Sequence, residues 1–351
     1  MPPARCPARP TTLLGVTVAP PVLTSVAPNT GPAAGTNPVA LNGSQFTGAI
    51  AVTFGSAAAL SFTVNTPSTI TAAVPPGTGT VNVTVRTPAG LSNTIPYTYA
   101  PTPALSTIAP NQGPTSGGTS VVLTGTGLTG TTAVTFGSTP ATSYTVNSAT
   151  QITAVTPAGT GAVAVTATTV GGTSGPVFFY YINAPSLLSV SPAAGPATGG
   201  TTVILTGTGL TGTTAVTFGS TPATSYTVNS ATQITAVTPA GTGSVACTVA
   251  GPGGTSNSVV YTYLAAPALT ALSPAQGPTD AGASVTLTGT GLTTAFAVRF
   301  GTAPAAFTVV SDTTAIAIAP AGPTGSVLVS VTTSGGTSNS LAYQRVAPPA
   351  I

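Results

Sequence analysis

Very few side chains in this sequence could take part in chemistry. The 351 residues include two aspartates, Asp280 and Asp312, and no histidine, lysine or glutamate. A hydrolase of a common kind needs a histidine, a carboxylate pair or a metal site, and a zinc or calcium site needs several clustered ligands. Both aspartates lie in stretches typical of solvated turns. We therefore predict that the chain is not an enzyme, with no catalytic, cofactor-binding or metal-binding residues and no cofactor.

Gly125, Gly127 and Gly130 have the spacing G-x-G-x-x-G of a dinucleotide-binding fingerprint, and the same spacing returns at 207–212. That fingerprint requires a helix directly after the glycines and an acidic residue about 20 positions further on. Here a stretch rich in Thr and Val follows, and the passage has no acidic residue. Positive φ angles in a bend between strands explain these glycines better.

The elements around these residues follow a repeat of 82 residues. Gly31, Gly113, Gly195 and Gly277 keep this spacing, and each precedes a proline. The stretch 123–161 returns unchanged at 205–243. A unit of about 80 residues is too long for a solenoid repeat and long enough to fold alone. We predict an irregular segment 1–20 and then four domains, at 21–100, 103–182, 185–264 and 267–346.

Apolar residues alternate within each copy. In the second copy, Val121 and Leu123 share one face, as do Val134 and Phe136. A period of two predicts half-buried strands. Seven short antiparallel strands per copy predict an all-β fold of four tandem immunoglobulin-like sandwiches. In the second copy we expect the strands near 104–109, 119–124, 132–137, 141–146, 151–156, 162–168 and 176–182.

The passages "PALSTIAPNQGPTSGGTSVVLTGTGLTGTTAVTFG", "VNSATQITAVTPAGTG" and "GGTSNSVVYTY" resemble the IPT/TIG family of immunoglobulin-like domains. The resemblance covers all four copies. The first copy departs from it with "GPAAGTNP" and "NGSQF", and the fourth loses one residue before Phe307 and regains one before Ile316. The family includes receptors, transcription factors and bacterial surface proteins, so the resemblance implies a fold more than a function.

Cys247 stands where the other copies have Val83, Val165 and Val329. We therefore predict a small buried hydrophobic side chain and not a reactive thiol. Cys6 lies in the irregular N-terminal segment, and we predict no disulfide between the two cysteines.

The five arginines are scattered, so they do not form the basic stripe that nucleic-acid binding needs. Arg299 stands where the other copies have Thr, which predicts an exposed side chain. Tyr99, Tyr181 and Tyr263 end their copies beside the next proline. We expect these rings to pack at domain junctions and not to stack on sugars.

The N-terminal segment carries two arginines and then a short apolar run, 12–19. A secretory signal requires an apolar stretch of 7–15 residues and a cleavage site with small residues. This segment matches both requirements poorly. An alternative is that 11–20 forms a strand that adds to a sheet edge. The sequence has no run of 18 or more apolar residues, so it predicts no membrane-spanning helix. The threonine-rich composition favours an extracellular or cell-surface location.

Short proline-containing linkers at 100–103, 183–185 and 265–267 stiffen the chain. We therefore expect a semi-rigid spacer that serves adhesion or presentation. Because sheet edges without Lys or Glu do not block strand pairing, an alternative is a subunit of an extracellular fibre. A carbohydrate-binding array is the weakest reading, since few aromatic residues look exposed. The expected partners are other proteins or further copies of the chain, through sheet edges, and glycans.

Overall fold

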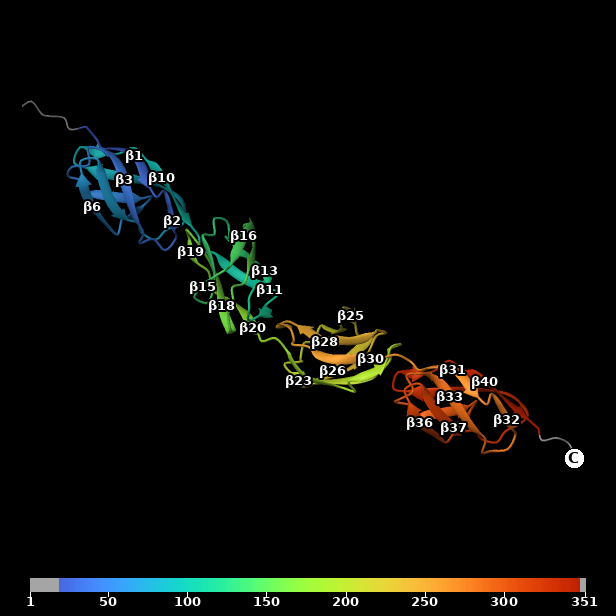
Figure 1. The fold of residues 1–351 in the computed structure, drawn as a ribbon. Helices are drawn as coiled ribbons and strands as arrows, with labels where there is room; N and C mark the ends of the chain where they lie inside the picture. Colours follow the sequence, from blue (N-terminus) through green and yellow to red (C-terminus); the bar gives the residue numbers. More distant parts are fainter. Residues whose placement is uncertain (1–18, 348–351) are drawn as a thin grey trace, which may run out of the picture. The chain divides into compact units, whose positions relative to one another are not determined.

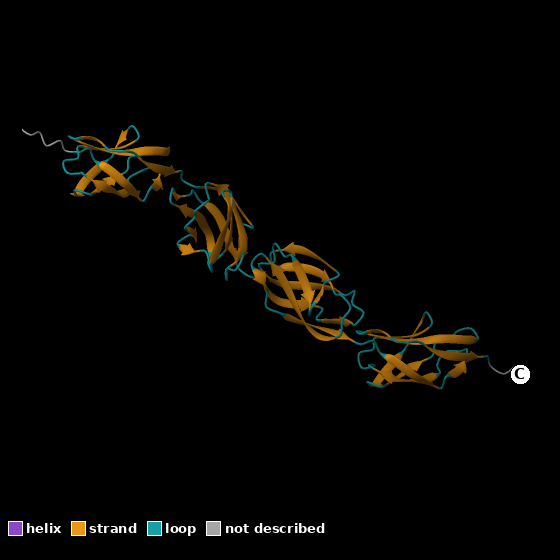
Figure 2. Ribbon diagram, turned by 90° about the horizontal axis from the view of Figure 1, so that it is seen from above, coloured by secondary structure: helices purple, strands orange, loops and turns teal. Residues whose placement is uncertain are grey.

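A computed structural model describes residues 19–347. In this range the chain forms strands, turns and loops and no helix (Figures 1 and 2). The chain groups into two compact units, the first ending at Tyr180 and the second starting at Tyr181, except that Gln112–Thr115 groups with the second. The sequence predictions for Cys6, for nearly all of the apolar run 12–19 and for most of the strand 11–20 concern residues outside the described range.

The strands form four repeated sets of ten, each of which builds one sandwich. The first set is β1 (Val22–Ala27), β2 (Thr30–Pro32), β3 (Pro38–Ser44), β4 (Ala51–Phe54), β5 (Ala57–Ala58), β6 (Ser61–Thr66), β7 (Thr69–Ala73), β8 (Gly79–Thr87), β9 (Gly90–Leu91) and β10 (Ile95–Ala100). The second is β11 (Ala104–Ala109), β12 (Gln112–Pro114), β13 (Ser120–Thr126), β14 (Ala133–Phe136), β15 (Thr139–Pro140), β16 (Ser143–Ser148), β17 (Gln151–Val155), β18 (Gly161–Thr169), β19 (Gly172–Thr173) and β20 (Val177–Ile182). The third is β21 (Ser186–Ser191), β22 (Ala194–Pro196), β23 (Thr202–Thr208), β24 (Ala215–Phe218), β25 (Thr221–Pro222), β26 (Ser225–Ser230), β27 (Gln233–Val237), β28 (Gly243–Gly251), β29 (Gly254–Thr255) and β30 (Val259–Leu264). The fourth is β31 (Ala268–Ser273), β32 (Gln276–Pro278), β33 (Ser284–Thr290), β34 (Ala297–Phe300), β35 (Ala303–Ala305), β36 (Phe307–Ser311), β37 (Thr314–Ile318), β38 (Gly325–Thr333), β39 (Gly336–Thr337) and β40 (Leu341–Val346).

Each set makes two facing sheets. In the first set, a four-stranded sheet has the order β1-β3-β7-β6 and a six-stranded sheet has the order β2-β10-β8-β4-β5, with β9 paired to β8. The other three sets repeat this order. β2 pairs with β10 in parallel, as β22 does with β30 and β32 with β40, and the other strand pairs of the first, third and fourth sandwiches are antiparallel. This confirms the predicted immunoglobulin-like sandwiches.

The seven strands predicted for the second copy are β11, β13, β14, β16, β17, β18 and β20. The structure adds β12, β15 and β19, which have three, two and two residues. Alternation is recognisable only over about four to eight residues, so no hydrophobic pattern could reveal strands this short.

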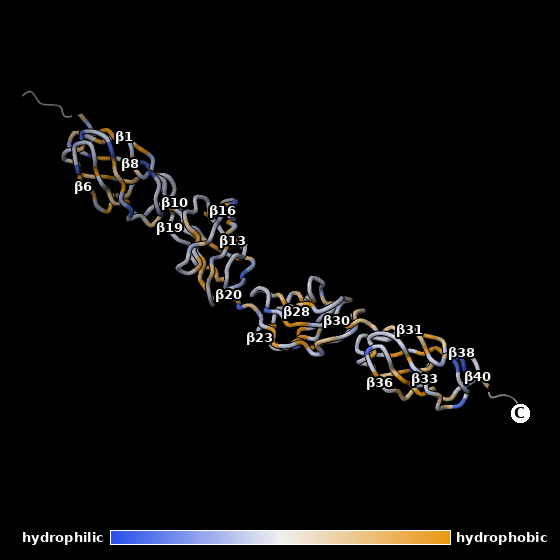
Figure 3. The backbone as a smooth tube through the Cα atoms, viewed as in Figure 1, coloured by the Kyte–Doolittle hydropathy of each residue, from blue (hydrophilic) through white to orange (hydrophobic). Residues whose placement is uncertain are grey.

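The predicted alternation is confirmed, and hydrophobic positions recur along the strands of each sandwich (Figure 3). Val121, Leu123 and Val134 are buried between the sheets. On the outer face, the hydroxyls of Thr135 and Thr166 form a hydrogen bond across β14 and β18, with an oxygen–oxygen distance of 3.0 Å. Paired threonine hydroxyls therefore satisfy each other on a face without charges.

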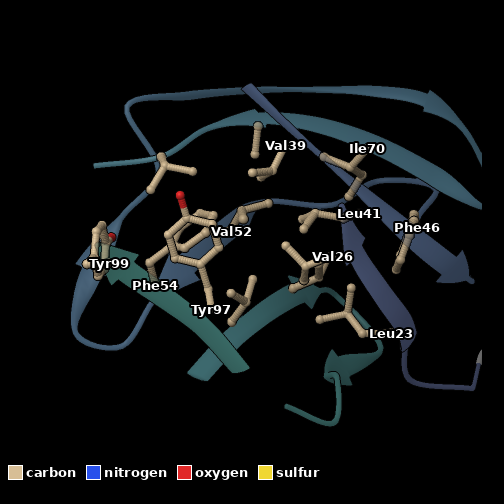
Figure 4. Packing of buried hydrophobic residues seen from close by; sticks show 14 residues of the cluster. Leu23, Val26, Val39, Leu41, Phe46, Val52, Phe54, Ile70, Tyr97 and Tyr99 are labelled. Atoms are coloured by element: carbon tan, nitrogen blue, oxygen red, sulfur yellow. The ribbon is translucent and has the colours of Figure 1, made fainter. Parts of the chain in front are cut away.

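In the first sandwich, buried side chains from both sheets fill the space between them (Figure 4). Tyr97 lies edge-on to Phe54 at a centroid distance of 5.3 Å and to Tyr99 at 5.1 Å. Edge-to-face pairs of this kind add to the stability that burial alone gives. The hydrophobic core is thus internal to each sandwich.

The fourth sandwich corrects one detail of the repeat alignment. Ala315 pairs with Leu287 and is buried, whereas Ile316 is 38% exposed. In the second sandwich the partner of Leu123 is Ile152, so Ala315 and not Ile316 occupies the core position. The lost residue is therefore regained after Ala319 and not before Ile316. A shift of one residue moves side chains to the opposite face of a strand, so the larger isoleucines face outward here.

Candidate functional site

The residues that could do chemistry do not come together. Within residues 19–347, no group of three or more His, Cys, Asp or Glu side chains could hold a metal ion. Asp280 is an exposed turn residue that precedes β33. Asp312 is an exposed residue of the turn between β36 and β37. Both positions agree with the predicted solvated turns.

Asp312 has a local structural role. Its carboxylate accepts hydrogen bonds from the Thr293 hydroxyl at 2.8 Å and from the backbone N–H of Gly291 at 3.2 Å. These bonds lower the pKa of the carboxyl group, and the bond from the Thr293 hydroxyl has the largest effect. A carboxylate used in this way fixes the bend after β33.

Cys247 lies in the core of the third sandwich and is fully buried, which confirms the predicted placement. Burial raises the pKa of its thiol to about 12. Since the thiolate is the reactive form, the folded protein keeps this sulfur unreactive at neutral pH.

The arginines divide into two kinds. Arg299 is exposed, as predicted, and donates a hydrogen bond to the carbonyl oxygen of Thr302 at 3.0 Å. Arg345 is only 5% exposed and donates to the carbonyl oxygen of Pro320 at 2.9 Å. The sequence analysis missed this burial, although Arg345 stands 82 residues after Tyr263, in the tyrosine position of the repeat.

The G-x-G-x-x-G glycines have two structural reasons and no helix follows them. Gly127 and Gly130 have positive φ angles of 67° and 73°, which agrees with the predicted bend. Gly125 does not, because a Cβ atom there would collide with the carbonyl oxygen of Ala104. The first glycine therefore allows close approach of β11 and β13 where their pairing shifts, and the expected positive φ was wrong for it.

The closing tyrosines belong to the sandwich cores. Tyr99 is 4% exposed and its hydroxyl donates to the carbonyl oxygen of Pro75 at 2.9 Å, within the same sandwich. Tyr263 also belongs to the core of its own sandwich. The expectation that these rings pack at domain junctions was therefore wrong, because an alternating strand places them on its inner face.

Exposed aromatic side chains occur at a place that the sequence analysis did not consider. Phe178 and Tyr180 on β20 are 52% and 42% exposed and lie on the outer face of the second sandwich. A comparison of the four copies at alternate positions of this strand could have found them. We call Phe178 and Tyr180 the aromatic strip.

Together, four immunoglobulin-like sandwiches without a cluster of reactive groups define a tandem repeat array. A family model for the IPT/TIG domain matches residues 21–99, 103–181, 185–263 and 267–344. The chain therefore belongs to the IPT/TIG family. No curated protein matches the chain in a sequence comparison.

Several solved structures are similar in fold. The extracellular region of plexin A4 is 17% identical, with 90% of this chain and 36% of that chain covered and a TM-score of 0.35. Invasin, a bacterial integrin-binding protein, is 16% identical, with 93% and 79% covered and a TM-score of 0.29. SGBP-B from a xyloglucan utilization locus of Bacteroides uniformis is 19% identical, with 66% of each chain covered and a TM-score of 0.25. At these identities the likeness concerns the fold alone.

Residues 19–347 contain no helix of the length and hydrophobicity that a membrane span requires.

Proposed function

We propose that the chain is a non-enzymatic array of IPT/TIG domains, with bounds at 21–100, 103–182, 185–264 and 267–346, that acts outside the cell or on its surface. It serves as a semi-rigid spacer that holds an adhesive or presented group at a distance. The scarcity of reactive side chains supports this role, because repeated copies of an unreactive unit add length or valency and no new reaction. The partners are other proteins, further copies of the chain, or glycans.

The packing of the linkers supports the proposed stiffness. In each of the last three sandwiches, the linker that enters the sandwich runs against a glycine in the turn before the short strand β19, β29 or β39. A Cβ atom on that glycine would collide with a linker carbonyl oxygen. Close backbone packing and proline both restrict a linker, so each linker is held to the sandwich it enters. The contacts are Pro101 with Gly171, Asn183 with Gly253 and Ala265 with Gly335.

Small-angle X-ray scattering of the full chain tests the proposal. Strands rise about 3.3 Å per residue, so four sandwiches in file would extend about 140–160 Å and give a radius of gyration of about 43 Å. A compact globule of this length would have a radius of gyration of about 20 Å. A value near the smaller figure at low protein concentration would refute the spacer.

A fibre subunit is the second candidate. The four-stranded sheets end in the unpaired edges of β6, β16, β26 and β36, and these strands carry no charged residue. Uncharged edges lack the usual protection against pairing with another chain. Electron microscopy over a range of concentrations separates the two: separate particles favour the spacer, and filaments that form with rising concentration favour the fibre.

A further inference from the structure

The outer face of the second sandwich differs from that of its three relatives. The side chains of the aromatic strip, Phe178 and Tyr180, stand at alternate positions of β20 and project to the same side. The other exposed aromatic residues of the described chain, Tyr226 and Phe296, lie singly in the third and fourth sandwiches. A paired, exposed aromatic surface is therefore particular to the second sandwich.

The fold does not need these rings. At the position of Tyr180, the first and third sandwiches have Thr98 and Thr262, whose hydroxyls form hydrogen bonds of 3.0 Å with Thr80 and Ser244 on the neighbouring strand. The second sandwich replaces both members of this polar pair, with a tyrosine and with Ala162. At the position of Phe178, the other sandwiches have Pro96, Val260 and Ala342.

The neighbouring strand has only small side chains beside the two rings and does not cover them. β18 lies next to β20, and its outward side chains near the strip are Ala162 and Ala164. Further across the same face, hydroxyl pairs join Thr135 to Thr166 at 3.0 Å and Thr168 to Thr173 at 3.0 Å. The face thus combines two apolar rings, a low alanine row and a border of hydroxyl groups.

The charge of this face narrows the class of ligand. Residues 103–182 contain no Asp, Glu, Lys, Arg or His, so nothing in this sandwich would attract an anionic or cationic polymer. A stable protein interface usually buries about 800 Å² on each partner, and two side chains fall far short of that. A neutral sugar ring matches better, because its C–H face packs on an aromatic ring while its hydroxyls bond to nearby threonines.

From this arrangement we propose that the aromatic strip binds a neutral, chain-like carbohydrate. Alternate residues of a strand lie about 7 Å apart, so the two rings would contact neighbouring sugars of a chain that runs along β20. The hydroxyls of Thr166 and Thr168 would bond to the sugar hydroxyls. This site deepens the proposed presentation role, but it does not depend on the length of the array.

The test is isothermal titration of the full chain with neutral hexasaccharides of β-1,4-glucose, β-1,3-glucose, β-1,4-xylose and β-1,4-mannose. The test variant is Phe178→Val with Tyr180→Thr, which gives the second sandwich the residues that the third already has. We expect at least one of these sugars to bind. The double variant should bind that sugar with an affinity at least about tenfold lower. The matched control Phe296→Ala removes an isolated ring that is 65% exposed and should leave affinity unchanged.

Three results would overturn the proposal: no binding of any of these sugars at millimolar concentration, equal binding by the double variant, or loss of self-association in that variant without any sugar binding. The last would mark the strip as a protein contact. Scattering measured on the same samples reports the spacer separately, so failure of the sugar site and failure of the spacer are distinguishable.

Discussion

The side-chain amide of Asn93 forms two hydrogen bonds with the backbone of Leu23. Its oxygen accepts from the Leu23 N–H at 2.8 Å and its nitrogen donates to the Leu23 carbonyl oxygen at 2.9 Å. The third and fourth sandwiches repeat this clip, through Asn257 with Leu187 and Asn339 with Leu269. In these three sandwiches the clip ties the first strand to the loop that precedes the last strand.

The second sandwich lacks the clip, because Gly175 stands in the asparagine position and Leu105 in the leucine position. Nothing lies within 4 Å of a Cβ atom built on Gly175, so the backbone leaves room for a side chain to start there. We expect Gly175→Asn to stabilise this sandwich by about 1–2 kcal/mol through two new hydrogen bonds. Calorimetry of the full chain measures this, with Gly175→Ala as the control that lacks the amide. Equal unfolding temperatures for the two variants would contradict the prediction.

Arg345 places a buried cation where the first three sandwiches have tyrosine. Its Nε atom has no hydrogen-bond partner among the described residues, and an unsatisfied buried donor costs about 1–3 kcal/mol. In the first sandwich Tyr99 makes the equivalent bond to a proline carbonyl, whereas in the third the hydroxyl of Tyr263 has no partner among the described residues. Because burying a neutral phenol costs less than burying a charged guanidinium, we expect Arg345→Tyr to raise the unfolding temperature of the fourth sandwich by several degrees, at about 4–8 °C per kcal/mol. A lower unfolding temperature would show that the guanidinium is better satisfied than its contacts indicate.

A neighbouring tyrosine position gives a second comparison within the chain. The Tyr97 hydroxyl is bonded to the Asn37 side chain at 3.0 Å, whereas the buried hydroxyls of Tyr261 and Tyr343 have no partner among the described residues. The second sandwich has Phe179 at this position. We expect Tyr261→Phe to stabilise its sandwich by about 1 kcal/mol or more and Tyr97→Phe to destabilise by a similar amount. Chemical denaturation of both variants checks the opposite signs, and shifts of the same sign would contradict the argument.

The thiol of Cys247 predicts a loss of stability at alkaline pH. Burial raises its pKa to about 12 in the folded state, while the unfolded thiol titrates near 8.5. Between these values the unfolded state releases the proton and the folded state keeps it, so stability falls as the pH rises above about 9. Cys247→Val introduces the residue of the sister copies and should reduce this fall. Unfolding temperatures of both proteins at pH 7 and pH 10.5 give the comparison, and an identical decrease would exclude the thiol as a cause.

Gly171 tests how the linker is held. A Cβ atom at this position would collide with the backbone of Pro101, so Gly171→Ala must displace the linker. We expect faster hydrogen exchange and faster proteolysis at 100–103, with a cost to the second sandwich of about 1–3 kcal/mol. Gly175→Ala is the matched control, because it adds the same atom in open space. Unchanged exchange in Gly171→Ala would mean that the linker does not depend on this contact.

The sequence predicted the sandwiches because burial on one face of a strand requires side chains to alternate, and this period is visible at Val121, Leu123, Val134 and Phe136. It did not predict which residue faces the core where the fourth copy is shifted by one position relative to the others. Ala315 and Ile316 are both compatible with a strand, and only their pairing with β33 shows that the smaller one is buried. Sequence alternation gives two candidate faces, whereas strand pairing selects between them.

The sequence alone determined that this is an array of four similar β-sandwiches with almost no charged side chains, because composition and a strict period are properties of the chain itself. The tertiary structure decided which side chains are shielded from water: it placed Arg345 inside a core and left Phe178 and Tyr180 outside one. Exposure depends on what the neighbouring strand presents, and that neighbour is distant in the sequence and is brought alongside only by folding.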